Sequence, residues 1–134
     1  MSNTHLLYSI LLINTAFLMR HFICDYLLQN RYMLGKFNAK GWVLPLAAHV
    51  GTVAIGTWII TFFITYNFVL AIELMIIDFI IHFSMDRIKA SPYIFGKLKP
   101  DNPRFWRVLG TDQTVHHFTD LILASIIMFI IIGC

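Results

Sequence analysis

The chain has 134 residues, of which 58% are hydrophobic and only 13% are charged. Soluble globular proteins contain about 25% charged residues, so this composition excludes an ordinary soluble domain and indicates an integral membrane protein. The formal net charge is only +3 at pH 7, so the positions of the charges are more informative than their sum.

Four hydrophobic segments are long enough to cross a bilayer as helices. They cover residues 4–28, 42–66, 68–89 and 111–133. Each is near the roughly 20 residues that a hydrocarbon core of about 30 Å requires. The short connection at Tyr66 and Asn67 predicts an antiparallel hairpin. We therefore expect an all-α fold, a single transmembrane domain over residues 1–134 built as a bundle of four helices.

The segment before the fourth span is rich in proline and cannot form one continuous helix. Asp101 or Asn102 precedes Pro103, a pattern typical of a helix start with proline in its first turn. We expect a short helix over residues 104–109 at the membrane surface. Gly110 should separate it from the fourth span.

Lysine and arginine are concentrated in two loops. They are Arg31, Lys36 and Lys40 after the first span, and Arg87, Lys89, Lys97, Lys99, Arg104 and Arg107 around the third loop. Cationic loops are retained in the cytoplasm, so we expect both loops there, both termini outside, and a bacterial-type inner membrane. Topology and contact with anionic headgroups account for these charges, and no nucleic-acid partner is expected.

Polar residues recur at every fourth position inside the hydrophobic segments. The stripes are His21, Asp25 and Gln29, then Asp78, His82 and Asp86, then Asp112, His116 and Asp120. Residues four apart lie on nearly one face of a helix. Ionisable groups in hydrocarbon cost several kcal/mol each unless they meet partners. The stripes are therefore expected to converge on one polar site.

Histidines from all four spans fall at a similar depth. His21, His49 and His82 lie about 10 Å from the cytoplasmic ends of their spans at 1.5 Å per residue, and His116 about 7 Å. Carboxylates gathered at the same level would repel one another or take up protons without a cation. This favours a metal site over the alternative, purely structural polar packing between helices.

Imidazole and carboxylate groups suit Zn²⁺, Mn²⁺, Fe²⁺ or Ni²⁺, and zinc is the preferred candidate. The candidates exceed the needs of one tetrahedral ion, so either some are supporting groups or two ions bind. The chosen ligands, each paired four apart on one helix, are His21, Asp25, His82, Asp86, Asp112 and His116. Gln29 and Gln113 are expected to support them by hydrogen bonds.

Three further residues are candidates for catalysis. His49 is either a ligand or a general base, and the alternative is a histidine that donates to a buried carboxylate. Asp78 and Asp120 continue their stripes inward and are expected to orient ligands or activate water. Arg20 is expected to extend its charge to the membrane surface.

The motifs His21-x3-Asp25-x2-Leu28-Gln29, His82-x3-Asp86 and Asp112-Gln113-x2-His116 occur in this order on successive predicted helices. The series resembles a family of small bacterial and phage integral membrane proteins of unknown function, over roughly residues 18–120. More distantly, it resembles inner-membrane proteins labelled as metal-dependent hydrolases. The resemblance implies a metal constellation and leaves the reaction open.

The leading hypothesis is a membrane-embedded, metal-dependent hydrolase acting on a lipid or lipid-linked substrate at the cytoplasmic leaflet. The headgroup would be held at the entrance by the basic residues Lys89, Lys97, Lys99, Arg104 and Arg107. Two alternatives remain: a cation or proton pathway, and a non-catalytic partner protein in which metal staples the bundle. Gly51 and Gly56, taken as lipid-facing, leave homo-oligomerisation open.

Overall fold

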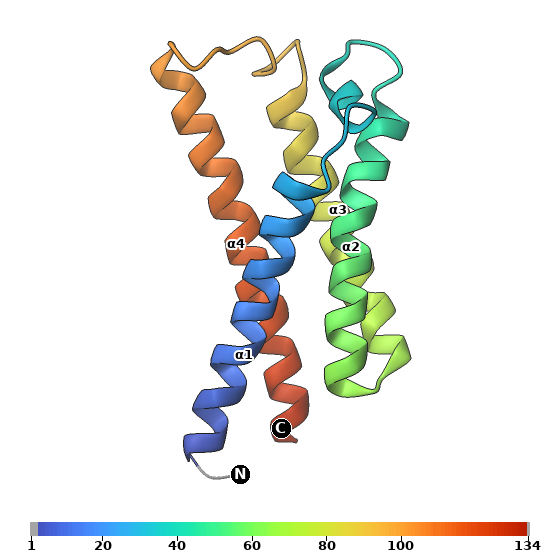
Figure 1. Ribbon diagram of the computed structural model, residues 1–134, viewed down its shortest axis with the longest axis vertical. Coiled ribbons are helices and arrows are strands. Elements are labelled where there is room, and N and C mark those ends of the chain that lie inside the picture. Colours follow the sequence, from blue (N-terminus) through green and yellow to red (C-terminus); the bar gives the residue numbers. More distant parts are fainter. Residues whose placement is uncertain (1–2, 134) are drawn as a thin grey trace.

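The protein is described by a computed structural model covering residues 3–133 and is helical, with no β-strand in that range (Figure 1). The four long helices are α1 (Asn3–Phe22), α2 (Val43–Thr65), α3 (Phe68–Ala90) and α4 (Pro103–Ile132). A π-helical turn, η1 (Ile23–Leu27), extends α1, and a short 3-10 helix, η2 (Met33–Phe37), precedes α2. All four long helices have the length and hydropathy to cross a membrane, which confirms the expected all-α bundle.

The helices run up and down between two ends of the molecule (Figure 1). The start of α1, the end of α4 and the α2–α3 hairpin lie at one end. The loop that carries η2 and the segment 91–102 lie at the other. We call the latter the loop end.

The helix termini follow the local sequence signals. Tyr66 closes α2 in the left-handed conformation with φ of 52°, and the Asn67 side chain accepts a hydrogen bond from the Leu70 amide. These two residues complete the predicted antiparallel hairpin. At α4 the N-cap is Asn102, whose side chain accepts from the Arg104 amide, and Pro103 is the first helical residue.

The separate surface helix over residues 104–109 is not formed, and that expectation was wrong. Residues 104–109 are the first turns of α4, which continues unbroken through Gly110. A glycine inside a helix costs only about 1 kcal/mol relative to alanine, which the rest of a long helix can absorb. At 1.5 Å per residue, the 30 residues of α4 span about 45 Å, more than a hydrocarbon core of about 30 Å.

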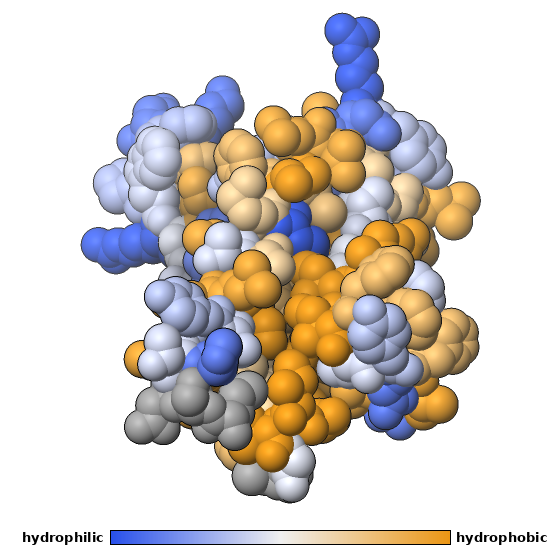
Figure 2. All heavy atoms as spheres, turned by 60° about the horizontal axis from the view of Figure 1, so that its bottom comes forward, coloured by the Kyte–Doolittle hydropathy of each residue, from blue (hydrophilic) through white to orange (hydrophobic). Residues whose placement is uncertain are grey.

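The bundle is apolar at the end opposite the loops. Side chains from α1, α3 and α4 form one buried cluster there: Ile13, Phe17, Leu70, Leu74, Leu123, Ala124, Ile127 and Met128. Outside, hydrophobic side chains cover most of the middle of the face in Figure 2. Large exposed residues such as Leu44, Ile122 and Phe129 belong to a surface suited to lipid.

Gly56 lets α1 approach α2. A Cβ atom at Gly56 would lie 2.6 Å from Arg20 Cγ, whereas one at Gly51 would meet nothing within 4 Å. Gly56 therefore faces Arg20 inside the bundle, which corrects the expectation that it faces lipid.

Replacing each of these two glycines by alanine distinguishes the effect of packing on stability from that of helix propensity. Both Gly51→Ala and Gly56→Ala gain up to about 1 kcal/mol of propensity. We expect only Gly56→Ala to lose about 1–3 kcal/mol by displacing Arg20. Thermal unfolding in detergent should give Gly56→Ala the lower midpoint. Equal midpoints for the two variants would contradict the close approach.

Candidate metal centre

Toward the loop end, the interior of the bundle is lined by ionisable side chains from every long helix. Apart from Asp25, which is partly exposed, each is at most 6% exposed. They are Arg20, His21, Asp25, Lys36, His49, Asp78, His82, Asp86, Asp112, His116 and Asp120. The expected convergence of the polar stripes is thus observed.

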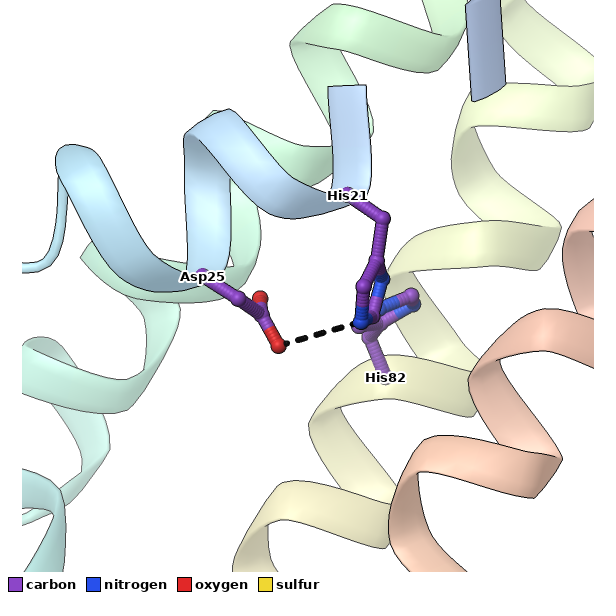
Figure 3. Close-up of side chains that lie close together, drawn as sticks. All are labelled: His21, Asp25 and His82. Carbon is purple, nitrogen blue, oxygen red and sulfur yellow. Dashed lines mark ion pairs between the residues drawn. The ribbon is translucent and has the colours of Figure 1, made fainter. Parts of the chain in front are cut away.

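The first group of ligand atoms comes from α1, η1 and α3. His21, Asp25 and His82 each offer an atom within 4.8 Å of the others. His21 and His82 point toward one another, and Asp25 approaches from the next turn (Figure 3). His21 Nε2 lies 3.4 Å from Asp25 Oδ2 and 3.1 Å from Gln113 Oε1. Asp25 belongs to the π-helical turn, a feature that occurs frequently at functional sites.

The second group comes from α3 and α4. Asp86, Asp112 and His116 meet the same 4.8 Å criterion. His116 Nε2 lies 3.3 Å from Asp112 Oδ1 and 3.5 Å from Asp86 Oδ1. All three side chains are at most 1% exposed, so the group is enclosed by protein.

The two groups adjoin. The His82 and His116 rings are stacked with centroids 3.7 Å apart. His49 Nε2 lies 3.0 Å from Asp86 Oδ2 and 3.6 Å from Asp25 Oδ1, so it contacts one carboxylate of each group.

These six residues are the six proposed as ligands from the sequence, and within residues 3–133 they form both groups capable of holding a metal ion. Helix spacing did not predict how the six residues divide into two groups. His82 and Asp86 stand four apart on α3 but fall in different groups. Helical spacing places side chains on one face, whereas crossing of the other helices decides which of them meet.

Several atoms in the groups have no hydrogen-bond partner among the described residues although they are buried. They are Asp25 Oδ1, His82 Nε2, Asp86 Oδ1, Asp112 Oδ1 and His116 Nε2. Four of them still make ionic contacts within the cluster, so of these five atoms only His82 Nε2 has neither a hydrogen bond nor an ion pair in the described part of the chain. Buried polar side-chain atoms usually have partners. All five are atoms through which carboxylate and imidazole bind divalent metals, so the donor set fits a metal ion.

Two lysines reach into the cluster. Lys36 Nζ lies 2.8 Å from Asp86 Oδ2, and Lys89 Nζ lies 2.6 Å from Asp112 Oδ2 and 3.2 Å from Asp86 Oδ1. The sequence placed both in surface loops. Instead η2 folds Lys36 inward, where burial lowers the pKa of its ammonium group and the ion pair with Asp86 opposes that shift.

Arg20 closes the inner side of the cluster. Its guanidinium group pairs with Asp78 Oδ2 at 3.0 Å and also with Asp120. It is 6% exposed, so the expectation that it extends to the membrane surface was wrong. Two carboxylates inside the bundle offer a better partner than a headgroup several turns away.

Asp78 links Arg20 to the first ligand group. Its Oδ1 lies 3.0 Å from His82 Nδ1, while Thr57 donates to its other oxygen. A proton on Nδ1 leaves the lone pair on His82 Nε2, the atom that has no partner. The structure thus brings Asp78 into contact with His82, and its role in orienting a ligand stays a prediction. Gln113, by contacting His21, takes the supporting position foreseen for it.

Carboxylates outnumber the arginine and lysine side chains of the cluster within residues 3–133. Five carboxylates, from Asp25, Asp78, Asp86, Asp112 and Asp120, face the three cationic side chains Arg20, Lys36 and Lys89. When the histidines are neutral, as metal ligands are, the excess is two negative charges, which one divalent cation would balance. Without a metal ion, a proton on His116, which contacts Asp86 and Asp112, would supply part of that balance.

Residues 13–132 match a family described as protein of unknown function, DUF3307. The chain belongs to this family. The match covers the second half of α1 and all of α2, α3 and α4, and so exceeds the region 18–120 in which the sequence motifs lie. No curated protein and no solved structure matches the chain.

The role of Arg20 can be tested by removing its charge. Arg20→Met strands two buried carboxylates and should cost about 3–5 kcal/mol of stability. The triple variant Arg20→Met, Asp78→Asn, Asp120→Asn removes all three charges and should recover most of that loss. Thermal unfolding in detergent measures both. A wild-type midpoint for Arg20→Met, or a still lower one for the triple variant, would contradict the ion-pair assignment.

Proposed function

We propose that the protein is a membrane-embedded metal-dependent hydrolase whose substrate is a lipid or lipid-linked molecule. The observation that carries the proposal is the pair of ligand groups, in which His82 Nε2 is buried without a partner among the described residues and carboxylates outnumber the arginine and lysine side chains by two. We place the protein in a bacterial-type inner membrane with the loop end in the cytoplasm, because the basic loops lie at that end.

Zinc is the ion that we assign, since mixed histidine and carboxylate ligation is common in its catalytic sites. The charge balance favours one divalent ion in the resting protein. The second ligand group provides room for another when an anionic substrate is present. Two adjacent ions are a recurring arrangement in phosphatases and nucleases.

A bound zinc ion would lower the pKa of a coordinated water from 15.7 toward about 7. His49 is placed to take up the proton, because its Nε2 contacts Asp25 of one group and Asp86 of the other. Asp78 holds His82 in the ligating tautomer. Asp120 reaches the site through Arg20, and we assign it a positioning role.

Of the alternatives, a transmembrane ion pathway is supported least. The buried apolar cluster of α1, α3 and α4 fills the bundle between the polar site and the opposite end. A non-catalytic bundle stabilised by a metal ion would use the same ligands. Only a measurement of substrate hydrolysis distinguishes it from a hydrolase.

Metal content tests the premise. Elemental analysis of the purified, zinc-loaded protein should give at least one ion per chain, and His116→Ala should reduce it. His117→Phe is the matched control, because His117 is exposed and a phenylalanine keeps the ring that packs against His21. Wild-type protein without stoichiometric metal, and with stability unchanged by a chelator, would exclude the site.

An activity measurement distinguishes the hydrolase from the non-catalytic, metal-stabilised bundle. Zinc-loaded protein would be incubated with mixed micelles containing phosphatidic acid and phosphatidylglycerol, and the products resolved by mass spectrometry. His49→Ala should keep its zinc while the rate falls by about 10²–10⁴-fold, the usual contribution of a general base. Zinc-loaded wild-type protein that releases no product would favour the non-catalytic alternative.

A further inference from the structure

A cavity of about 220 Å³ opens beside the two lysines at the loop end. Its polar lining residues are Asp25, Gln29, Lys36, Lys89 and Gln113. The other lining residues are largely apolar: Tyr26, Phe37, Phe95, Gly96, Leu98, Phe105, Val108 and Leu109. The lining is therefore amphipathic.

Both lysines form ion pairs with carboxylates that belong to the second ligand group. Lys36 is paired with Asp86, and Lys89 with Asp86 and Asp112. A divalent ion held by Asp86 and Asp112 would compete with the ammonium groups for these oxygens. The displaced ammonium groups would then need another anion, and the cavity they line is the nearest space.

We propose that Lys36 and Lys89 form a binding site for the phosphate headgroup of a membrane lipid, and that metal binding assembles this site. The inference rests on the proposed metal centre and names the substrate class for it. Of the basic residues expected to hold the headgroup, Lys89 is retained. Lys36 takes the place of Lys97, Lys99, Arg104 and Arg107.

The charge balance supports a phosphate monoester. One divalent ion in each ligand group would turn the two uncompensated negative charges of the cluster into two positive ones. A phosphate monoester carries close to two negative charges at pH 7 and would neutralise them. The second ion and the headgroup should therefore bind together.

The cavity dimensions and walls favour a lipid over free phosphate. A volume of about 220 Å³ is below the roughly 300–1,000 Å³ of typical ligand pockets, so the cavity suits a headgroup and not whole acyl chains. A second cavity of about 190 Å³ shares Lys89, Phe95 and Val108 with the first. It adds the apolar Met85 and Ile88, and also the polar Arg107, Thr111 and Asp112. The start of a lipid chain would lie there, between α3 and α4.

Binding of short-chain phosphatidic acid to the full chain, followed by native mass spectrometry in a neutral detergent, tests the inference. Coupling between two sites is reciprocal and commonly amounts to about 5–150-fold in affinity. We expect phosphatidic acid to bind at least about fivefold more tightly to zinc-loaded protein than to chelator-treated protein. Equal affinity in the two states would overturn the coupling, whereas protein that never retains zinc would overturn the proposed metal centre instead.

Variants test which residues bind the phosphate headgroup. The double variant Lys36→Gln, Lys89→Gln should lose the zinc-dependent gain, while Lys97→Gln, on the neighbouring loop, should keep it. Leu109→Trp narrows the cavity without touching a carboxylate, and should also lose the gain if the double variant fails to fold. A loss in Lys97→Gln equal to that of the double variant, or full binding by Leu109→Trp, would overturn the assignment.

Ligand chemistry identifies the source of the phosphate. Diacylglycerol, which lacks the phosphate, should show no zinc-dependent binding, and inorganic phosphate should bind more weakly than phosphatidic acid. Inorganic phosphate that binds as tightly as phosphatidic acid would overturn the lipid assignment. Diacylglycerol that binds equally well would overturn the role of the lysines.

Discussion

The burial of five aspartates inside a bundle of apolar helices is the constraint that organises this protein. Carboxylates away from water cost several kcal/mol each unless cations accompany them. Arg20, Lys36 and Lys89 each meet that need from a different segment: the end of α1, the inward-folded η2 and the end of α3. Because carboxylates outnumber these cations by two, the same constraint that folds the loop end also favours binding of a divalent ion.

The hairpin end and the loop end of the bundle have different roles in the structure. Apolar packing among α1, α3 and α4 fixes the helices at the hairpin end, so that their polar stripes face one another at the loop end. Arg20 and Asp78 lie at the boundary, where Asp78 orients His82 and Arg20 neutralises the carboxylates beneath the ligand groups. Beyond them, the amphipathic cavity is lined by both lysines and by Asp25 of the first ligand group. A substrate bound there would contact the lysines and this ligand together.

Much of this arrangement is readable from the sequence, for physical reasons. Hydropathy gives the four spans, and the four-residue recurrence of histidine and aspartate gives the six candidate ligands, because both patterns act within single helices. Contacts between side chains of different helices depend on how the helices cross, and the sequence does not predict them. Spacing alone does not show that His82 and Asp86 join different groups, or that Gly56 accommodates Arg20. No sequence pattern indicates that Lys36 is buried, since its burial depends on how η2 folds back. Arg20 stands out in the sequence as a cation within a membrane span. It was assigned to the surface because its partners lie far away in sequence.

X-ray absorption spectroscopy at the zinc edge of the zinc-loaded protein addresses the central claim most directly, because it reports the atoms around the ion. The account predicts nitrogen and oxygen ligands at about 2.0–2.2 Å with the outer-shell scattering of imidazole, and loss of part of that scattering in His116→Ala. A zinc environment of oxygen alone, or one unchanged by His116→Ala, would show that the buried histidines and aspartates do not hold the metal.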